Sequence, residues 1–260
     1  MKTVTRSTVS LAILSTSLLM AVVAHANHSW GNYHWGRTAN PLPLQLGDNV
    51  NTKWDGHLTL ASSDWNVSSV LETSVVAGKS KPQNCRATAG RAEVCNSSYG
   101  ATGWLGIAQI WISGDHITQG VVKLNDTYFD TPKYNTPAWR NLVTCQEVGH
   151  IFGLGHQDED FGNAPLGTCM DYTDPDPTPN QHPNEHDYEL LETIYAHLDS
   201  VNTYSTGGGT GGKGRGKPAI VGQDMDLSNP SEWGNRVSDH QYERDLGNGN
   251  KVITDVFWIR

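Results

Sequence analysis

Residues able to do metal chemistry gather in the stretch TCQEVGHIFGLGH, which ends at His156. If this stretch begins as a helix, Gln146 and His150 stand four residues apart and can reach toward one point, with Glu147 beside them. Gly153 can take a left-handed conformation and end the helix. The chain can then bend back, so that His156 arrives at the same point from the following loop.

The pattern resembles the metzincin zinc-peptidase motif HExxHxxGxxH, with Gln146 in place of the first histidine. A methionine turn downstream is a second feature of that family, and Cys169-Met170-Asp171-Tyr172 is similar to it. The resemblance is matrixin-like and covers positions 41 to 200. It implies an α+β catalytic domain with a mixed twisted sheet, helices above the cleft and an irregular lower lobe.

The resemblance also implies an activity, that of a zinc-dependent endopeptidase. One zinc ion would be held by Gln146, His150 and His156, with an open position for water. Glu147 would take the proton of that water as it attacks a peptide carbonyl. In the same layout, an edge strand of the sheet receives the substrate backbone by strand addition.

Two residues of the methionine turn acquire roles through the same resemblance. Met170 would form a packed floor beneath the metal and would not be a ligand. Tyr172 could stabilise the developing oxyanion, as a nearby tyrosine does in some metzincins.

The hypotheses about function differ in the role that they give to Gln146. Its amide oxygen is neutral and reaches about as far as the outer imidazole nitrogen, so the site would keep its full positive charge. An amide oxygen is, however, a weaker and harder donor toward zinc, and it suits calcium or manganese better. One alternative is a catalytically inactive pseudopeptidase acting as a secreted binding protein, although Glu147 would be superfluous there. Another is structural zinc completed by His182 or His186.

The start of the chain has the features of a secretory signal. Lys2 and Arg6 precede an apolar run at 11–23, and Ala24-His25-Ala26 is a cleavage signal. The run is short for a membrane anchor, so we expect a secreted chain that starts at Asn27 and is extracellular or periplasmic. Removing two positive and no acidic residues takes the formal net charge of the 260-residue chain from −9 to −11.

This acidic balance argues against nucleic acid or an anionic membrane as a partner. We expect a monomer whose partner is a protein or peptide substrate, with no membrane contact after signal cleavage. Zinc is the expected cofactor. Calcium could bind Asp158, Glu159 and Asp160, but EF-hand spacing is missing and a solvated acidic loop is the better interpretation.

Four cysteines in a secreted chain suggest disulfides, and three connectivities exist. Pairing Cys85 with Cys95 is favoured because it would close a short polar loop. Pairing Cys145 with Cys169 is implied by the resemblance, which places the metal helix near the methionine turn. A cysteine-ligated zinc is disfavoured because no C-x-x-C occurs.

Hydrophobic periodicity locates the elements that must position these residues. Strands are expected at 41–46, 68–77, 104–113 and 117–124. Helices are expected at 52–65, from Pro137 to the glycine turn with Thr136 as N-cap, and at 186–198. Loops are expected at 78–103, 126–135 and after His156.

Composition divides the chain into four parts. We expect a signal peptide at 1–26, the metzincin-like domain at 27–204, a linker at 205–218 and a small C-terminal β appendage at 219–260. The linker contains TGGGTGGKGRGK. Positions 241–246 and 251–259 flank GNGN, a hairpin signal. The appendage is too short for a core of its own, and we identify no catalytic set within it.

Overall fold

The computed structural model describes Met1 and residues 28–176, 179–205, 225 and 227–260. The predicted signal peptide (apart from Met1) and most of the predicted linker lie outside these residues. Within the described ranges, no helix combines the length and the apolar character that a membrane span requires.

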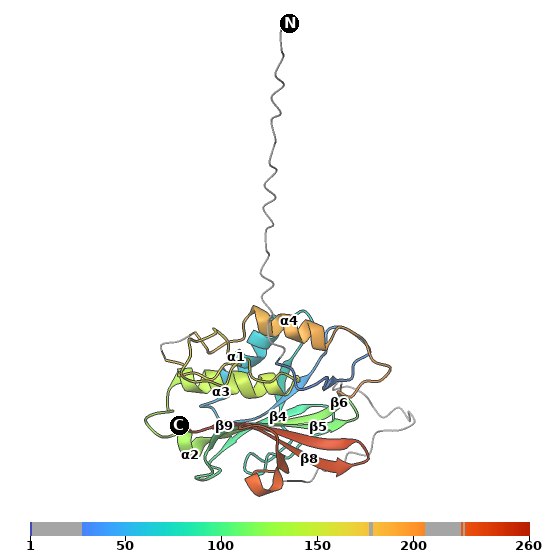
Figure 1. Cartoon of the computed structure of the whole chain (residues 1–260). Helices are drawn as coiled ribbons and strands as arrows, with labels where there is room; N and C mark the ends of the chain where they lie inside the picture. Colours follow the sequence, from blue (N-terminus) through green and yellow to red (C-terminus); the bar gives the residue numbers. More distant parts are fainter. Residues whose placement is uncertain (2–27, 177–178, 206–224, 226) are drawn as a thin grey trace.

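A nine-stranded mixed sheet forms the centre of the molecule, and the three longest helices cover one of its faces (Figure 1). The strands are β1 His34–Trp35, β2 Gln45–Asn49, β3 Ser74–Ala77, β4 Ala92–Ser97, β5 Trp104–Ser113, β6 His116–Asn125, β7 Asn235–Arg236, β8 Gln241–Gly247 and β9 Asn250–Trp258. The helices are α1 Asp55–Trp65, α2 Asp126–Phe129, α3 Pro137–His150, α4 Glu185–Ile194 and a 3-10 helix at Pro230–Glu232. The α+β class expected from the sequence is confirmed.

The strand order is β3-β2-β4-β6-β5-β9-β8-β7, and β1 pairs with the first residues of β6. Strands β1, β2, β3, β4 and β6 pair in parallel, whereas β5, β7, β8 and β9 join through antiparallel ladders. The order places β9 directly against β5.

The sheet carries an apolar core on each face. On β5, Ala108 and Ile110 belong to the core beneath the helices, whereas Ile107 and Trp111 belong to the core on the opposite face. The second core is closed by Trp233. Burying a large apolar side chain contributes about 1.5–3 kcal/mol, so both faces of β5 are firmly held.

Helix α3 begins and ends as the sequence predicts. The Thr136 side chain accepts a hydrogen bond from the Trp139 amide at 3.2 Å, and Pro137 occupies the first turn. After His150 the chain turns at Gly153, whose φ of 98° is a conformation that a Cβ would strain. The turn ends the helix and redirects the chain toward His156.

Other boundaries differ from the sequence predictions. Strand β2 lies further along the chain than 41–46, β3 is shorter than 68–77, and α4 ends before 198. The predicted loop at 78–103 contains β4, and the predicted loop at 126–135 contains α2. Strand β4 escaped prediction because it carries polar side chains yet lies buried between two parallel neighbours, β2 and β6.

Both favoured disulfides are present, and they close on different faces of the sheet. Cys85–Cys95 joins the segment before β4 to that strand, and its sulfurs belong to the second core. Cys145–Cys169 fastens α3 to the methionine turn. This second bond restrains the helix that carries the candidate metal ligands.

The predicted C-terminal hairpin forms from β8 and β9 (Figure 1). Its second strand pairs antiparallel with β5 along the whole of that strand, from Trp104 opposite Trp258 to Ser113 opposite Asn250. The hairpin therefore extends the main sheet.

Candidate metal centre

Three metal-binding side chains meet between α3 and β9, and we call His150, His156 and Asp255 the α3–β9 cluster. The Asp255 Oδ1 atom lies 3.5 Å from His150 Nε2 and 3.2 Å from His156 Nε2. Zinc bonds of about 2.0–2.2 Å to nitrogen and oxygen place neighbouring ligands of a tetrahedron about 3.3–3.6 Å apart. The spacing therefore fits the ligand shell of a small divalent cation.

Local structure fixes each member of the α3–β9 cluster. His150 ends α3 and His156 follows the Gly153 turn, which brings the two ring centroids within 4.7 Å. Asp255 comes from β9, opposite Ala108 of β5. Because side chains alternate along a strand, Asp255 faces the helices.

Hydrogen bonds turn both histidines toward Asp255. His150 Nδ1 lies 2.8 Å from the Leu154 carbonyl oxygen, and His156 Nδ1 lies 3.0 Å from Glu159 Oε1. Both Nε2 atoms are buried and make no hydrogen bond of their own. A partner on Nδ1 that leaves Nε2 free is the usual arrangement around a metal-binding histidine.

Burial and neighbouring charges give the two histidines of the α3–β9 cluster different protonation states. Burial lowers the pKa of His150 to about 4, so its ring is neutral at pH 7. Burial opposes protonation of His156 as well, but the charge of Asp255 and the bond to Glu159 raise its pKa to about 9. Asp255 keeps a pKa below its usual range, against burial, because both histidines face it. A metal ion would displace the proton of His156.

Glu147 lies beside the α3–β9 cluster as a buried carboxyl group. Neither oxygen has a hydrogen-bond partner, and burial raises its pKa well above the usual range, with Asp255 adding to the effect. Space for it comes from Gly106 of β5, where a Cβ would lie 2.6 Å from Glu147 Oε1. A carboxyl group held this way is a candidate for proton transfer.

Gln146 and Met170 connect α3 to the methionine turn. Gln146 Nε2 donates to the Cys169 carbonyl at 2.8 Å, while its Oε1 is buried and has no hydrogen-bond partner. Met170 is fully buried, and its sulfur occupies the space that a side chain at Gly149 would need. An amide oxygen without a partner, one turn before His150, is available as a further ligand.

Tyr172 contacts the α3–β9 cluster and the strand that supplies Asp255. Its ring centroid lies 4.5 Å from that of His156, and its hydroxyl donates to the Val256 carbonyl at 3.0 Å. His240 Nδ1 lies 3.1 Å from the same carbonyl oxygen. The hydroxyl proposed for an oxyanion is thus bonded to a backbone carbonyl of β9.

Sequence reasoning missed three residues at this centre, namely Asp255, His240 and Trp30. Trp30 stacks on the His150 ring at a centroid distance of 5.0 Å. A signal for Asp255 did exist, because it interrupts the apolar alternation between Ile253 and Phe257 on the helix-facing side of β9.

The alternative ligands named from the sequence lie elsewhere. His182 pairs with Asp64 at 2.7 Å, and the His186 ring packs beside His28. Neither belongs to the α3–β9 cluster. Of the acidic triplet considered for calcium, Glu159 supports His156, as described above.

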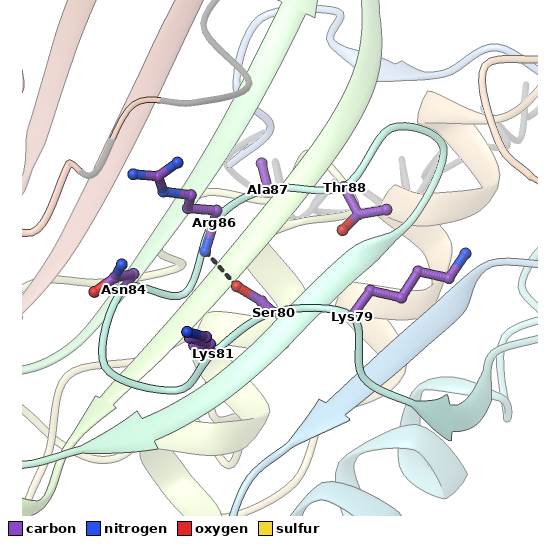
Figure 2. Close-up of a pocket in the computed structure, with 7 residues that line it drawn as sticks. All are labelled: Lys79, Ser80, Lys81, Asn84, Arg86, Ala87 and Thr88. Atoms are coloured by element: carbon purple, nitrogen blue, oxygen red, sulfur yellow. Dashed lines mark hydrogen bonds between the residues drawn. The ribbon is translucent and has the colours of Figure 1, made fainter.

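A pocket with a different chemistry is lined by the loop that joins β3 to β4 (Figure 2). It is lined by Lys79, Ser80, Lys81, Asn84, Arg86, Ala87 and Thr88. The Arg86 amide donates to the Ser80 hydroxyl across it. Its lining includes no carboxylate, imidazole or thiol, so it offers no favoured zinc ligand.

No protein family model matches this chain, and no curated protein matches it either. The metzincin resemblance stays a prediction from the motif.

Proposed function

We propose that this protein is a secreted zinc-dependent endopeptidase whose metal is held at the α3–β9 cluster. The observation that supports this most is the convergence of two imidazole nitrogens and a carboxylate oxygen at tetrahedral spacing, beside the unpaired carboxyl group of Glu147. The two disulfides agree with an oxidising compartment outside the cytosol.

The cluster supplies three donors, His150, His156 and Asp255, and the unpaired Oε1 of Gln146 would be the fourth. Structural zinc sites use four protein ligands, whereas catalytic sites keep one position open for water. With Asp255 in place, the site is closed. Removal of Asp255 would leave the three ligands of the sequence motif and one open position.

We propose that β5 is the strand that receives the substrate backbone, so that β9 occupies the place of the substrate. It pairs antiparallel with β5, as an added peptide would, and it covers that edge. Its Val256 carbonyl lies within hydrogen-bonding distance of Tyr172 Oη and His240 Nδ1. We therefore propose that the described conformation is a latent form, held closed by the chain's own C-terminal strand.

The residues have distinct tasks in the open form. Zinc would supply Lewis acidity to the attacking water and the scissile carbonyl. Glu147 would accept a proton from that water and deliver it to the leaving amine. Tyr172, released from Val256, would donate its hydroxyl to the developing oxyanion. The Cys145–Cys169 bond would keep α3 and the methionine turn in register during these steps.

A second candidate function is a secreted binding protein with an inactive site. The observation in its favour is the same strand β9, because a permanently covered β5 edge and a permanent Asp255 ligand would exclude both substrate and water. Glu147 weighs against this reading, since an unpaired buried carboxyl group costs free energy and has no task in a binding protein.

The two candidates are separated by measuring zinc content and casein digestion on the mature protein, before and after a chelator. Asp255→Ala opens the site, and Glu147→Gln is then added to it. The endopeptidase predicts digestion by Asp255→Ala that chelator abolishes, and none by the double variant at equal zinc content. Bound zinc without digestion by Asp255→Ala would select the binding protein.

A further inference from the structure

A second group of metal-binding side chains lies away from the α3–β9 cluster. We call His34, His116 and Asp199 the β1–β6 cluster. Asp199 Oδ1 lies 3.3 Å from His34 Nε2 and 3.0 Å from His116 Nε2. A third histidine, His197, places its Nε2 3.4 Å from the same oxygen. Three imidazoles thus converge on one carboxylate oxygen.

The fold brings these residues together from three parts of the chain. His34 on β1 and His116 on β6 are direct partners in a parallel ladder, so their side chains leave the sheet side by side. Asp199 follows α4 and is fixed by two backbone contacts to Arg37: its amide donates to the Arg37 carbonyl, and its Oδ2 accepts from the Arg37 amide. The carboxylate is therefore presented in a set orientation.

More imidazole nitrogens surround Asp199 Oδ1 than its lone pairs can accept hydrogen bonds from. His34 Nδ1 lies 2.6 Å from the Asn32 carbonyl oxygen, to which it must donate. One carboxylate oxygen has two lone pairs, whereas three imidazole nitrogens lie around Asp199 Oδ1.

A divalent cation at the centre of the group would bind these nitrogens and the carboxylate oxygen at the same time. The three nitrogen–oxygen distances approach the edge of a zinc tetrahedron, about 3.3–3.6 Å. The Nδ1 bond of His34 to a backbone carbonyl is the typical outer support of a metal-binding histidine. Asp199 is also oriented for binding, because its Oδ2 accepts from the Arg37 amide while its Oδ1 faces the histidines.

We propose that His34, His116 and Asp199, completed by His197, form a second zinc site with a structural role. His34, His116 and Asp199 supply three ligands, and the exposed His197, whose Nε2 lies 3.4 Å from Asp199 Oδ1, would move in to fill the fourth position of a tetrahedral zinc ion, so that none remains for a substrate water. The His197 side chain is 56 % exposed, which gives the ion a path from solvent.

The site would fasten the N-terminal segment to the body of the protein. That segment runs from Trp30, which stacks on His150, to His34 on β1. Metal at the β1–β6 cluster would thus restrain the segment that covers one face of His150. This inference does not depend on the proposed endopeptidase activity.

The test is zinc stoichiometry of the full mature chain by equilibrium dialysis against Zn²⁺ alone. His116→Ala and Asp199→Asn should each bind one zinc equivalent fewer than the wild type, whatever the α3–β9 cluster holds. His182→Ala is the matched control, because that histidine also pairs with an aspartate but belongs to neither cluster. It should leave the stoichiometry unchanged.

A second measurement, with Co²⁺ in place of zinc, reports ligand geometry. The wild type should show visible absorption of tetrahedral Co²⁺ that decreases in His116→Ala. Circular dichroism checks folding, and His116→Ala suffices if Asp199→Asn does not fold. Equal zinc equivalents in the wild type and in folded His116→Ala would overturn the inference.

Discussion

The α3–β9 cluster and the β1–β6 cluster use the same ligand types, yet their surroundings differ. Around the first, five buried polar atoms lack hydrogen-bond partners: Gln146 Oε1, both Glu147 oxygens, His150 Nε2 and His156 Nε2. No side-chain atom of His34, His116 or Asp199 is both buried and without a hydrogen-bond partner. Reactive sites keep groups unsatisfied so that a substrate or ion can use them, whereas structural sites satisfy every group.

The two clusters also differ in which ligand can leave. Asp199 is tied by two backbone contacts to Arg37 within the folded body. Asp255 lies on a hairpin that follows a glycine-rich sequence and joins the sheet at β5. If both clusters hold zinc as proposed, Asp199 would be a permanent ligand of the β1–β6 cluster and Asp255 an exchangeable ligand of the α3–β9 cluster.

The largest expected effect concerns Glu147. Glu147→Gln in the Asp255→Ala background should lower casein digestion by about 10²–10⁴-fold, because it removes the proton acceptor. Zinc content should stay the same. Glu159→Gln is a comparison variant, since it weakens support of His156 without removing a proton acceptor at the reacting atoms. Undiminished digestion by the Glu147 variant would show that the base lies elsewhere.

Loss of the Cys145–Cys169 bond should affect the α3–β9 cluster alone. The bond closes a loop with a sequence separation of 24, and its removal by a double Cys→Ala change should cost about 3.5 kcal/mol of unfolding free energy. Urea unfolding measures this. Zinc affinity should fall at the α3–β9 cluster and stay unchanged at the β1–β6 cluster. The matched Cys85–Cys95 variant should cost about 2.8 kcal/mol and leave both affinities intact.

The next expected effect tests whether Asp255 can leave. A contact between charged groups is worth about 1.5–3 kcal/mol, so Asp255→Ala should raise casein digestion by about tenfold or more while zinc remains bound. Asp239→Ala, at an exposed position of the same C-terminal segment, should change nothing. If Asp255→Ala loses its zinc and gains no activity, Asp255 is a permanent ligand like Asp199, and the distinction between the clusters fails.

The smallest expected effect concerns His197, the exposed ligand. His197→Ala should weaken zinc binding at the β1–β6 cluster by about tenfold, because water can replace an exposed imidazole. His116→Ala, which removes a ligand from the sheet itself, should weaken it further. Competition with a chromogenic chelator measures both affinities. An equal loss of zinc affinity in the two variants would show that the exposure of a ligand does not determine how much it contributes to binding.

The sequence was most informative where local structure determines position. Thr136, Pro137 and the apolar stripe define α3, and Gly153 defines its end, so the approach of His156 to His150 follows from short-range geometry. The periodicity of β5 and β6 and the GNGN turn of the hairpin were equally clear. These features depend on residues within a few positions of one another.

Strand β4 and the two clusters required contacts between distant segments. A polar strand such as β4 is stabilised by its neighbours in the sheet, and its own sequence resembles a loop. His34 and His116 became a pair only through the register of β1 with β6. Asp255 joined His150 and His156 only because β9 took the free edge of β5.

The sequence by itself thus determined the helix–turn–histidine unit and the acid beside it, since backbone propensities and helical spacing act over one or two turns. The tertiary structure decided which carboxylate completes each cluster and whether the β5 edge is open. Both depend on which strand edges pair. Backbone hydrogen bonds between strands do not depend on side-chain identity, so the burial of apolar faces selects the partner strand.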